Sequence, residues 1–431
     1  MSIIKGIISN GLANVVQKIV RIADQLLLVP FFLTNWGGCR LWRMAYAYYH
    51  SECPCLFLYL GFGSAVVNSF VLAYAAGDKQ KAADLRKSGF WIITLTIILG
   101  LLLTVISMFV CTKMQLFDKS HINAHDAMLA VAYMMVARLI TFYTQLVEGF
   151  YRGARKAALG SLFGSGNYLI NIVVGLIVLL LGYGVVAFAF SQLIIAVMYI
   201  IAYSIYGCRL IDLQKYRGRI LKSDIYDIVR KGIGYLMTPI WQSVYFQGTT
   251  FVVRITLGAE AVAIFNTVRT VCRSVNQLFS IINASIFPDL QYEYGQGHIQ
   301  TVHKYFRIAV VLSMLIGFMG CSVLAVFGLN IYGWWTNSVL TVPHCVWNVF
   351  MLGAFFNAVW WTSVVTYRMT NQPYHFAIAS TVMAFVSVGT TYFFSSFWGV
   401  IRRSYRMLSV RTCYGYICSS RLMQIVRNDT L

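Results

Sequence analysis

Residues 90–111 have the sequence FWIITLTIILGLLLTVISMFVC, which contains no charged side chain. An α-helix of about 20 apolar residues is long enough to cross the hydrocarbon core of a bilayer. Similar apolar runs recur along the whole chain, at about residues 11–35, 55–76, 127–150, 160–181, 184–206, 233–256, 261–288, 306–328, 345–368 and 374–397. The sequence therefore predicts an all-α integral membrane protein with 11–12 transmembrane helices.

The composition excludes a water-soluble protein. Of the 431 residues, 59% are hydrophobic and 11% are charged, whereas soluble domains carry about 25% charged residues. The 34 Lys and Arg residues exceed the 14 Asp and Glu residues, and in a membrane protein such an excess is typical of cytoplasmic loops. We therefore predict no nucleic-acid partner. The cysteines and histidines do not have the spacing of metal ligands, so we expect no metal and no cofactor.

Basic residues are concentrated in every second connection between the predicted spans. These connections contain Lys79, Lys81, Arg86, Lys87, Arg152, Arg155, Lys156, Arg209, Lys215, Arg217, Arg219, Lys222, Arg230, Lys231, Lys304, Arg307 and Arg368. The alternate connections contain only Arg40, Arg43, Lys113 and Lys119. Because cytoplasmic loops are enriched in Lys and Arg, this pattern predicts a cytoplasmic N-terminus.

The longest basic connection, residues 207–232, divides the chain into two predicted lobes. An N-terminal lobe at 1–206 has six spans, and a C-terminal lobe at 233–397 has five recognised spans. Two stretches depart from the pattern, at 37–57 and in an atypical basic tail at 398–431. We hypothesise that both stretches have diverged or are translated out of frame.

A weak internal repeat agrees with the two lobes. The segments Gly61 to Trp91 and Phe279 to Val310 each contain a helix of small residues, a glycine turn, a basic amphipathic connection and an apolar span. Parallel repeats of this kind are common in transporters.

Four of the predicted spans carry polar side chains at helical spacing. The first has Asn10, Asn14, Gln17, Lys18, Arg21 and Gln25, with Asp24 beside Arg21; the fourth has Arg138, Thr141, Gln145, Glu148 and Arg152; the seventh has Thr238, Gln242, Tyr245 and Thr249; the eighth has Asn266, Arg269, Arg273, Gln277 and Ser280. Each set lies on one face of its helix.

These faces have two interpretations. Polar side chains can join helices within a membrane, and Lys or Arg near a helix end can extend to the headgroups. Lys18, Arg21, Arg269 and Arg273 fit this poorly, since they lie well inside their spans, where a charge is costly. They favour a hydrated cationic cavity for an anion, because the Arg fork matches phosphate oxygens. Its other polar residues would be Asn14, Gln17, Arg138, Gln145, Gln242 and Asn266.

Two acidic residues, Asp24 and Glu148, are candidates for coupling to a proton or sodium ion, or for pairing with a neighbouring arginine. Pro30, Pro239 and Pro288 are expected to kink their helices, which suits alternating access. The glycines of Gly61-Phe62-Gly63 are expected to mark close helix packing.

The motif Leu60-Gly61-Phe62-Gly63-Ser64-Ala65, followed by Asn68 and Ala76-Gly77-Asp78, resembles bacterial polysaccharide flippases of the Wzx type. Gly11-Leu12-Ala13-Asn14 and Glu148-Gly149-Phe150-Tyr151-Arg152-Gly153 are similar to the same family. The family lies in a superfamily with the MATE drug exporters and lipid II flippases. The resemblance covers most of residues 1–36 and 58–397.

This resemblance implies a two-lobed MATE-like bundle with a central cavity in the bacterial inner membrane. It implies export of undecaprenyl-pyrophosphate-linked oligosaccharide repeat units, for surface polysaccharide such as the O-antigen of lipopolysaccharide. The expected partners are this lipid-linked oligosaccharide, membrane lipids and the polysaccharide polymerase machinery. By position, the pyrophosphate is assigned to Lys18, Arg21, Arg269 and Arg273.

Three alternatives stay open at this point. A cation-coupled drug or metabolite exporter would need an acidic cavity. A membrane glycosyltransferase or glycan polymerase would need a long external loop, and the longest such connection is at about 111–126. A non-transporting assembly subunit is the third. We therefore expect a transporter and not an enzyme.

Overall fold

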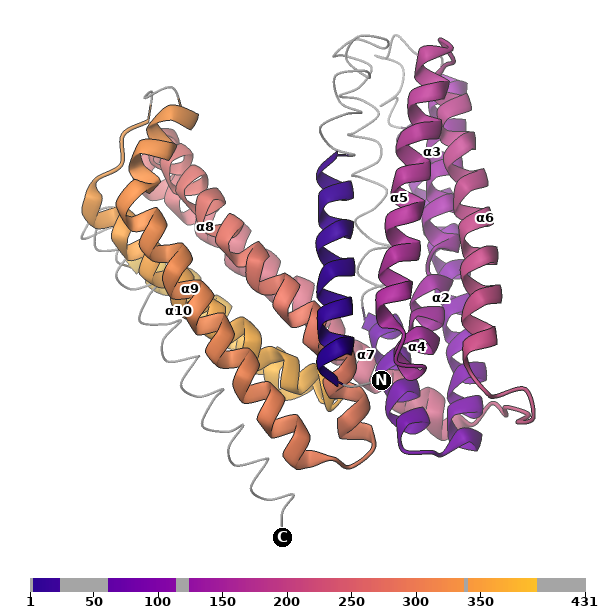
Figure 1. Cartoon of the computed structure of the whole chain (residues 1–431). Helices are drawn as coiled ribbons and strands as arrows, with labels where there is room; N and C mark the ends of the chain where they lie inside the picture. Colours follow the sequence, from indigo (N-terminus) through magenta and orange to yellow (C-terminus); the bar gives the residue numbers. More distant parts are fainter. Residues whose placement is uncertain (1–2, 24–60, 114–123, 337–339, 394–431) are drawn as a thin grey trace. The chain divides into compact units, whose positions relative to one another are not determined.

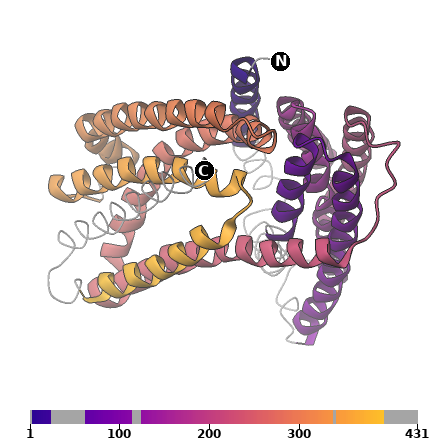
Figure 2. The ribbon, with the colours of Figure 1, turned by 90° about the horizontal axis from the view of Figure 1, so that it is seen from below.

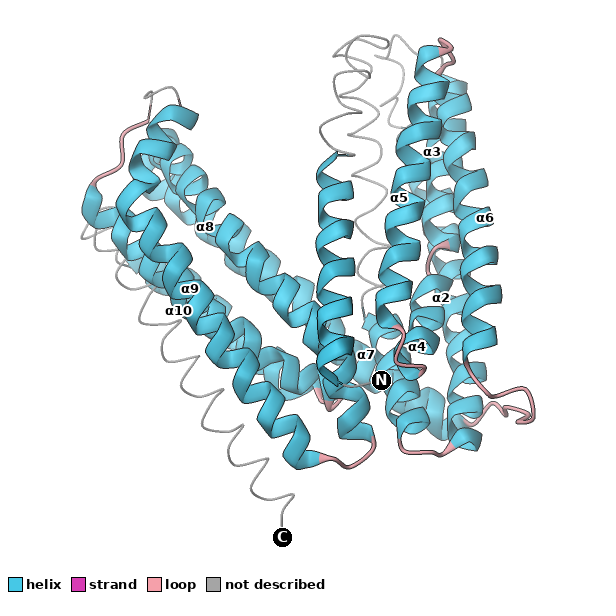
Figure 3. Ribbon diagram, in the orientation of Figure 1, coloured by secondary structure: helices cyan, strands magenta, loops and turns pink. Residues whose placement is uncertain are grey.

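The computed structural model describes residues 3–23, 61–113, 124–336 and 340–393. Within these ranges the chain is helical, with short connecting turns and no strand (Figures 1 and 3). The helices comprise residues 3–23, Gly61–Ala75, α2 (Lys79–Lys113), α3 (Ala124–Ile140), α4 (Tyr143–Gly153), α5 (Ala157–Leu180), α6 (Val185–Leu210), α7 (Lys222–Ser243), the π-helix η1 (Val244–Gly248), α8 (Thr249–Gly295), α9 (Ile299–Trp335), α10 (His344–Met369) and Pro373–Phe393. The predicted all-α class is confirmed. Asp24, Gln25, Pro30 and the atypical stretches 37–57 and 398–431 lie outside the described residues.

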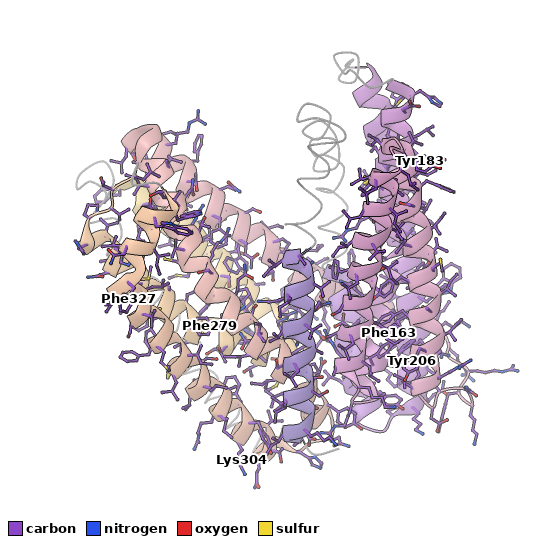
Figure 4. All side chains as sticks on the ribbon, turned by 45° about the horizontal axis from the view of Figure 1, so that its top comes forward. Phe163, Tyr183, Tyr206, Phe279, Lys304 and Phe327 are labelled. Atoms are coloured by element: carbon purple, nitrogen blue, oxygen red, sulfur yellow. The ribbon has the colours of Figure 1, made fainter. Side chains whose placement is uncertain are left out.

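Seven helices in the described ranges are long and apolar enough to cross a membrane. Their outer surfaces carry large apolar side chains such as Phe327 on α9, which is labelled in Figure 4 and is 57% exposed. A continuous apolar exterior of this kind suits lipid and not water. The chain is therefore a multi-pass membrane protein.

The longest of these spans, α9, extends beyond the hydrocarbon core. Its 37 residues give a length of about 55 Å, against about 30 Å for the core. The exposed Lys304 and Arg307 lie near its start, whereas Trp334 and Trp335 end it. Cationic and aromatic side chains are the usual residues at the two membrane interfaces.

The chain forms two compact units. The first contains Met1–Leu236 with Gly295–Gly297, and the second contains Met237–Tyr294 with His298–Leu431. The chain thus passes from one unit to the other within α7, a few residues beyond the predicted connection 207–232. The central cavity predicted from the sequence would need both units, and it stays a prediction.

The core of the first unit is built where small residues let helices approach. Phe70 and Val67 of the helix Gly61–Ala75 pack against Gly149 on α4, and Phe70 contacts the ring of Phe150 at 5.2 Å between centroids. Nearby, the side chain of Gln145 occupies the space that a Cβ at Gly63 would need. The predicted packing role of these glycines is therefore confirmed.

The internal repeat is visible as two copies of one turn. Gly77 and Gly297 have φ of +83° and +79°. In the first copy the Asp78 amide donates to Ala73 O at 3.1 Å, and in the second the His298 amide donates to Glu293 O at 3.0 Å. Because glycine alone adopts positive φ without strain, the sequence could reveal this pair.

A second repeated turn has a residue other than glycine at its positive-φ position and was not predicted. Arg155 after α4 and Asn371 after α10 have φ of 56° and 55°. The following amides, of Lys156 and Gln372, donate to Tyr151 O and Tyr367 O at 2.8 and 3.0 Å. The repeat therefore extends beyond the predicted segments.

Replacing Gly77 or Gly297 with alanine should destabilise the protein. No atom lies within 4 Å of a Cβ at either position, so the cost is conformational, about 1–2 kcal/mol each. The melting temperature of the purified protein in detergent measures the effect. Gly166→Ala in the middle of α5 is the control, because its Cβ also meets nothing within 4 Å and its φ is negative. That variant should be stabilised by up to about 1 kcal/mol; equal changes in all three variants would contradict the argument.

Candidate functional site

In the first unit, the polar face of the helix at residues 3–23 lies along α5. The Ser161 hydroxyl donates to Asn14 Oδ1 at 3.2 Å. One turn on, the amide of Gln17 covers Gly164, with Nε2 2.7 Å from the position of a Cβ there. The contacts advance in the same steps of three and four residues on both helices, so the two helices run parallel. The small residues of α5 make room for these polar side chains.

Two cations of this helix, Lys18 and Arg21, lie towards its end. Arg21 is exposed, and its guanidinium carbon lies 5.3 Å from the centroid of the Tyr168 ring on α5. Lys18 is partly buried. Asn14 and Gln17 thus join helices, as the structural interpretation of the sequence proposed, whereas Arg21 presents its charge at the surface of the unit.

The fourth predicted span is broken into α3 and α4 at Thr141 and Phe142. Glu148 and Arg152 form an ion pair one turn apart on α4, so the pairing interpretation of Glu148 is the one that the geometry favours. Arg138, at the end of α3, is exposed. The polar residues of this span are therefore divided between two helices.

In the second unit, a π-helix joins α7 to α8. Pro239 lies inside α7 and cannot donate to the carbonyl one turn earlier. The chain then winds as a π-helix over Val244–Gly248. Such turns occur frequently at functional sites. Hydrophobic periodicity does not report the hydrogen-bond register of a helix, so the sequence analysis missed this element.

The carbonyl of Phe246, in the π-helix, gathers several donors. The hydroxyl of Thr250 donates to it at 2.8 Å, and the guanidinium of Arg269 donates to it through Nη1 at 3.1 Å. The same guanidinium donates through Nη2 to Thr250 Oγ1 at 3.0 Å and to Asn266 Oδ1 at 2.6 Å. We call Phe246, Thr250, Asn266 and Arg269 the arginine clamp. α8 is broken at Gly258, where φ is 84° and ψ is −179°. The clamp therefore ties the π-helix and the first residues of α8 to the predicted polar face beyond this break.

Aromatic rings enclose the clamp. The guanidinium carbon of Arg269 lies 5.4 Å from the ring centroid of Phe246 and 5.1 Å from that of Phe265. A cation over an aromatic face is attracted by the negative charge of the ring. Arg269 is therefore held by both hydrogen bonds and rings.

One turn further along α8, Arg273 is in a different situation. Its guanidinium carbon lies 4.2 Å from the centroid of the Phe246 ring, and its side chain is exposed. Within the described residues this ring contact is the only interaction of its charge. Arg273 thus has guanidinium donors available for a ligand.

The structure therefore brings together Arg269, Arg273 and Asn266 of the predicted site, and adds Phe246 and Thr250. Gln242 lies on α7 in the same unit and is partly buried. Within the described ranges, no group of three His, Cys, Asp or Glu side chains could hold a metal ion.

Comparisons with known proteins agree with this architecture. A family model described as "Polysaccharide biosynthesis protein" matches residues 55–291. No curated protein sequence is significantly similar to the chain.

Solved transporter structures share the fold. The crystal structure of a MATE mutant superposes with a TM-score of 0.81 at 15% identity, covering 99% of this chain and 98% of that chain. A MOP superfamily transporter from Pyrococcus furiosus, whose title says that the reverse polarity of its binding pocket suggests a different function, has a TM-score of 0.77 at 13% identity, with 99% and 96% covered. An outward-facing multidrug resistance MATE transporter has a TM-score of 0.77 at 16% identity, with the same coverage. The predicted MATE-like fold is confirmed.

Removing the clamped arginine should destabilise the protein more than removing its neighbour. Arg269→Ala deletes hydrogen bonds from a charged donor, each contributing about 1.5–3 kcal/mol. Arg273→Ala deletes an exposed cation–π contact of about 0.5–1 kcal/mol. The melting temperatures of the two purified variants test this difference. Asn266→Ala should reproduce part of the Arg269→Ala effect, and an equal loss of stability in Arg269→Ala and Arg273→Ala would disprove the clamp.

Proposed function

Because the chain belongs to the polysaccharide biosynthesis protein family and has the fold of MATE transporters, we propose that it flips lipid-linked oligosaccharide repeat units across the bacterial inner membrane. The family and the fold are those of transporters and not of enzymes. The cargo would be carried on undecaprenyl pyrophosphate and used for surface polysaccharide such as O-antigen. Transport would proceed by alternating access, driven by a proton or a sodium ion.

The single observation that supports an anionic cargo is the environment of Arg273. Its guanidinium is exposed, lies over the Phe246 ring and has no carboxylate partner among the described residues. A guanidinium offers paired donors that match two oxygens of a phosphate. A drug exporter for organic cations would instead need carboxylates at this position.

The arginine clamp supports an anionic cargo at Arg273, because it orients the Phe246 ring on which Arg273 packs. Arg269 holds the Phe246 carbonyl and lies against its ring, so the π-helix and the ring are fixed from two sides. Arg273 packs on that ring. Arg269 is thus a positioning residue in our proposal, and Arg273 is the residue that meets the pyrophosphate. In the first unit, Arg21 and Lys18 would provide further cationic contacts.

Alternating access needs a point where a helix can bend. Pro239 removes one backbone hydrogen bond from α7, and the π-helix at Val244–Gly248 interrupts the regular ladder soon after it. The lipid tail would stay in the bilayer while the headgroup crosses through the protein. We propose that bending at this place accompanies that step.

The distribution of charge in the first unit supports a cytoplasmic N-terminus. The turns at one end of its helices carry Lys79, Lys156 and Lys215, whereas the turn at Gly182–Gly184, at the other end, carries no charged residue (Figure 1). Because cytoplasmic loops are enriched in basic residues, the substrate headgroup would be taken up at the basic end.

Complementation of a bacterium that lacks its own flippase tests the function. We expect the wild-type chain to restore surface glycan and Arg273→Ala to reduce it about tenfold to a hundredfold, since a hydrogen bond to a charged group contributes about 1.5–3 kcal/mol. Arg273→Lys should retain part of the activity. Both the surface glycan and the lipid-linked repeat units that accumulate inside the cell are measured.

Arg254→Ala is the matched control. Arg254 is also an exposed arginine of α8, but it lies before the break at Gly258, whereas Arg273 lies beyond it. It should restore surface glycan as well as the wild type does. Full activity of Arg273→Ala would rule out its role in cargo binding, and failure of the wild type with normal expression would rule out the flippase function.

A further inference from the structure

The connection between α6 and α7 forms a fixed cationic surface in the first unit. It extends from the end of α6 and returns beside the start of α2 (Figures 1 and 2). Lys215, Arg217, Arg219 and Lys222 all lie within eight residues of one another and all are exposed. We call these four side chains the basic surface.

Main-chain contacts hold this connection in place. The Arg219 amide donates to Asp84 Oδ1 at 2.7 Å, and Gln80 Nε2 donates to Arg217 O at 3.1 Å. Gly218 packs so closely on the backbone of Ala83 that a Cβ would collide with it. These contacts use backbone atoms of the connection, and the four basic side chains remain exposed.

Three acidic residues nearby pair with lysines outside the basic surface, and a fourth, Asp84, accepts hydrogen bonds from the Arg219 amide and from Gln80 Nε2. Asp212 pairs with Lys79 at 2.9 Å, Asp224 with Lys81 at 2.5 Å, and Asp227 with Lys231 at 2.6 Å. The hydrogen bond from Lys79, and then its charge, lower the pKa of Asp212. This carboxylate therefore stays ionised and paired at neutral pH.

The basic surface itself has no carboxylate partner. Within the described ranges, its four cations form no ion pair. Its positive charge is thus available to an external anion.

Apolar side chains are interspersed with these cations. Ile220 and Leu221 are 43% and 37% exposed, and Tyr226 on the first turns of α7 is 69% exposed. Exposed isoleucine and leucine side chains would make no favourable contact with a soluble, hydrated polyanion. Cations mixed with aliphatic side chains and tyrosine are typical of a membrane interface.

The position of the connection relative to the bilayer agrees with this chemistry. On α6, exposed apolar side chains continue to Ile205 and Tyr206, the latter labelled in Figure 4. The connection begins at Ile211, about 7 Å further along the helix axis. A headgroup layer is about 5–7 Å thick on each side of the hydrocarbon core, so a hydrocarbon boundary at Tyr206 would place the start of the connection at the headgroups.

We propose that the basic surface binds the headgroups of anionic phospholipids. The phosphates would contact Lys215, Arg217, Arg219 and Lys222, while Ile220, Leu221 and Tyr226 contact the boundary of the acyl chains. This binding is independent of the cargo, and it would fix the start of α7 at the membrane surface.

The test measures lipid selectivity of the full chain reconstituted in phosphatidylcholine. Electron paramagnetic resonance of spin-labelled phosphatidylglycerol and spin-labelled phosphatidylcholine gives their relative association with the protein. A basic side chain near an anionic surface strengthens binding roughly fivefold. We expect the wild type to prefer phosphatidylglycerol at least about threefold at low salt, and this preference to decline in 1 M salt, where the Debye length is about 3 Å.

The test variant replaces all four cations with glutamine, as Lys215→Gln, Arg217→Gln, Arg219→Gln and Lys222→Gln. The control variant removes the same charge from exposed cations elsewhere, as Lys5→Gln, Lys156→Gln, Lys304→Gln and Arg307→Gln. The test variant should lose most of the preference and the control should keep most of it. Since backbone atoms hold the connection, the test variant should keep the wild-type melting temperature.

A second variant checks the apolar contribution without changing any charge. Ile220→Ser with Leu221→Ser should weaken the association of both lipids at this surface while leaving the salt dependence unchanged.

Three outcomes overturn the proposal. The first is an unchanged preference in the four-glutamine variant, and the second is an equal loss in the control. The third is a wild type that shows no lipid preference but binds soluble polyglutamate through the basic surface, which would make the surface a docking site for an acidic protein.

Discussion

A guanidinium within an apolar helix bundle needs polar partners, because moving a charge out of water without them costs several kcal/mol. Arg269 obtains such a partner from the main chain, at the carbonyl of Phe246. That carbonyl lies in a π-helix, where the backbone ladder shifts by one residue and hydroxyl and guanidinium donors can converge on it. The position of the Phe246 ring, and with it the environment of Arg273, follows from this one hydrogen bond.

In the first unit, polar side chains of the helix at 3–23 contact small residues of a neighbouring helix and not a main-chain carbonyl. Asn14 and Gln17 are accommodated by Ser161 and Gly164 on α5, where small side chains leave room for them. In both units, polar side chains of the helix face contact other groups of the same unit, as Asn14 and Gln17 do in the first and Asn266 and Arg269 do in the second. The last cation of each face, Arg21 or Arg273, is exposed over an aromatic ring. This shared arrangement argues that the exposed arginines have a common role.

Much of the fold could be predicted from the sequence, because membrane helices are long and apolar. Each of the eleven predicted spans overlaps with described helical residues, and parts of the spans 11–35, 55–76 and 374–397 lie outside the described residues. The helix at 3–23, α7 and α8 carry polar faces, and none of them is among the seven helices that are long and apolar enough to cross a membrane by length and composition. The helices that hold the candidate site are thus the ones that an apolar criterion alone overlooks.

What the sequence could not predict depends on backbone geometry. The π-helix at Val244–Gly248 has no compositional signature, so Phe246 and Thr250 were missed although Asn266, Arg269 and Arg273 were found. The turns at Arg155 and Asn371 were missed because the residue with positive φ is not a glycine in either, unlike Gly77 and Gly297. Asp24 lies outside the described residues, so its coupling role stays a prediction.

The cations behind the net charge of +20 fall into two groups, those that pair with a carboxylate and those that do not. Lys79, Lys81 and Lys231 each have a carboxylate. The first two pairs join α2 to the connection and to α7, and the third lies within α7. The basic surface and Arg273 have none among the described residues. In both places a main-chain atom holds the element, Arg219 N at Asp84 in one and Phe246 O at Arg269 in the other. An element fixed through its backbone keeps its cations oriented without neutralising them, which is the condition for attracting an anion from outside the protein.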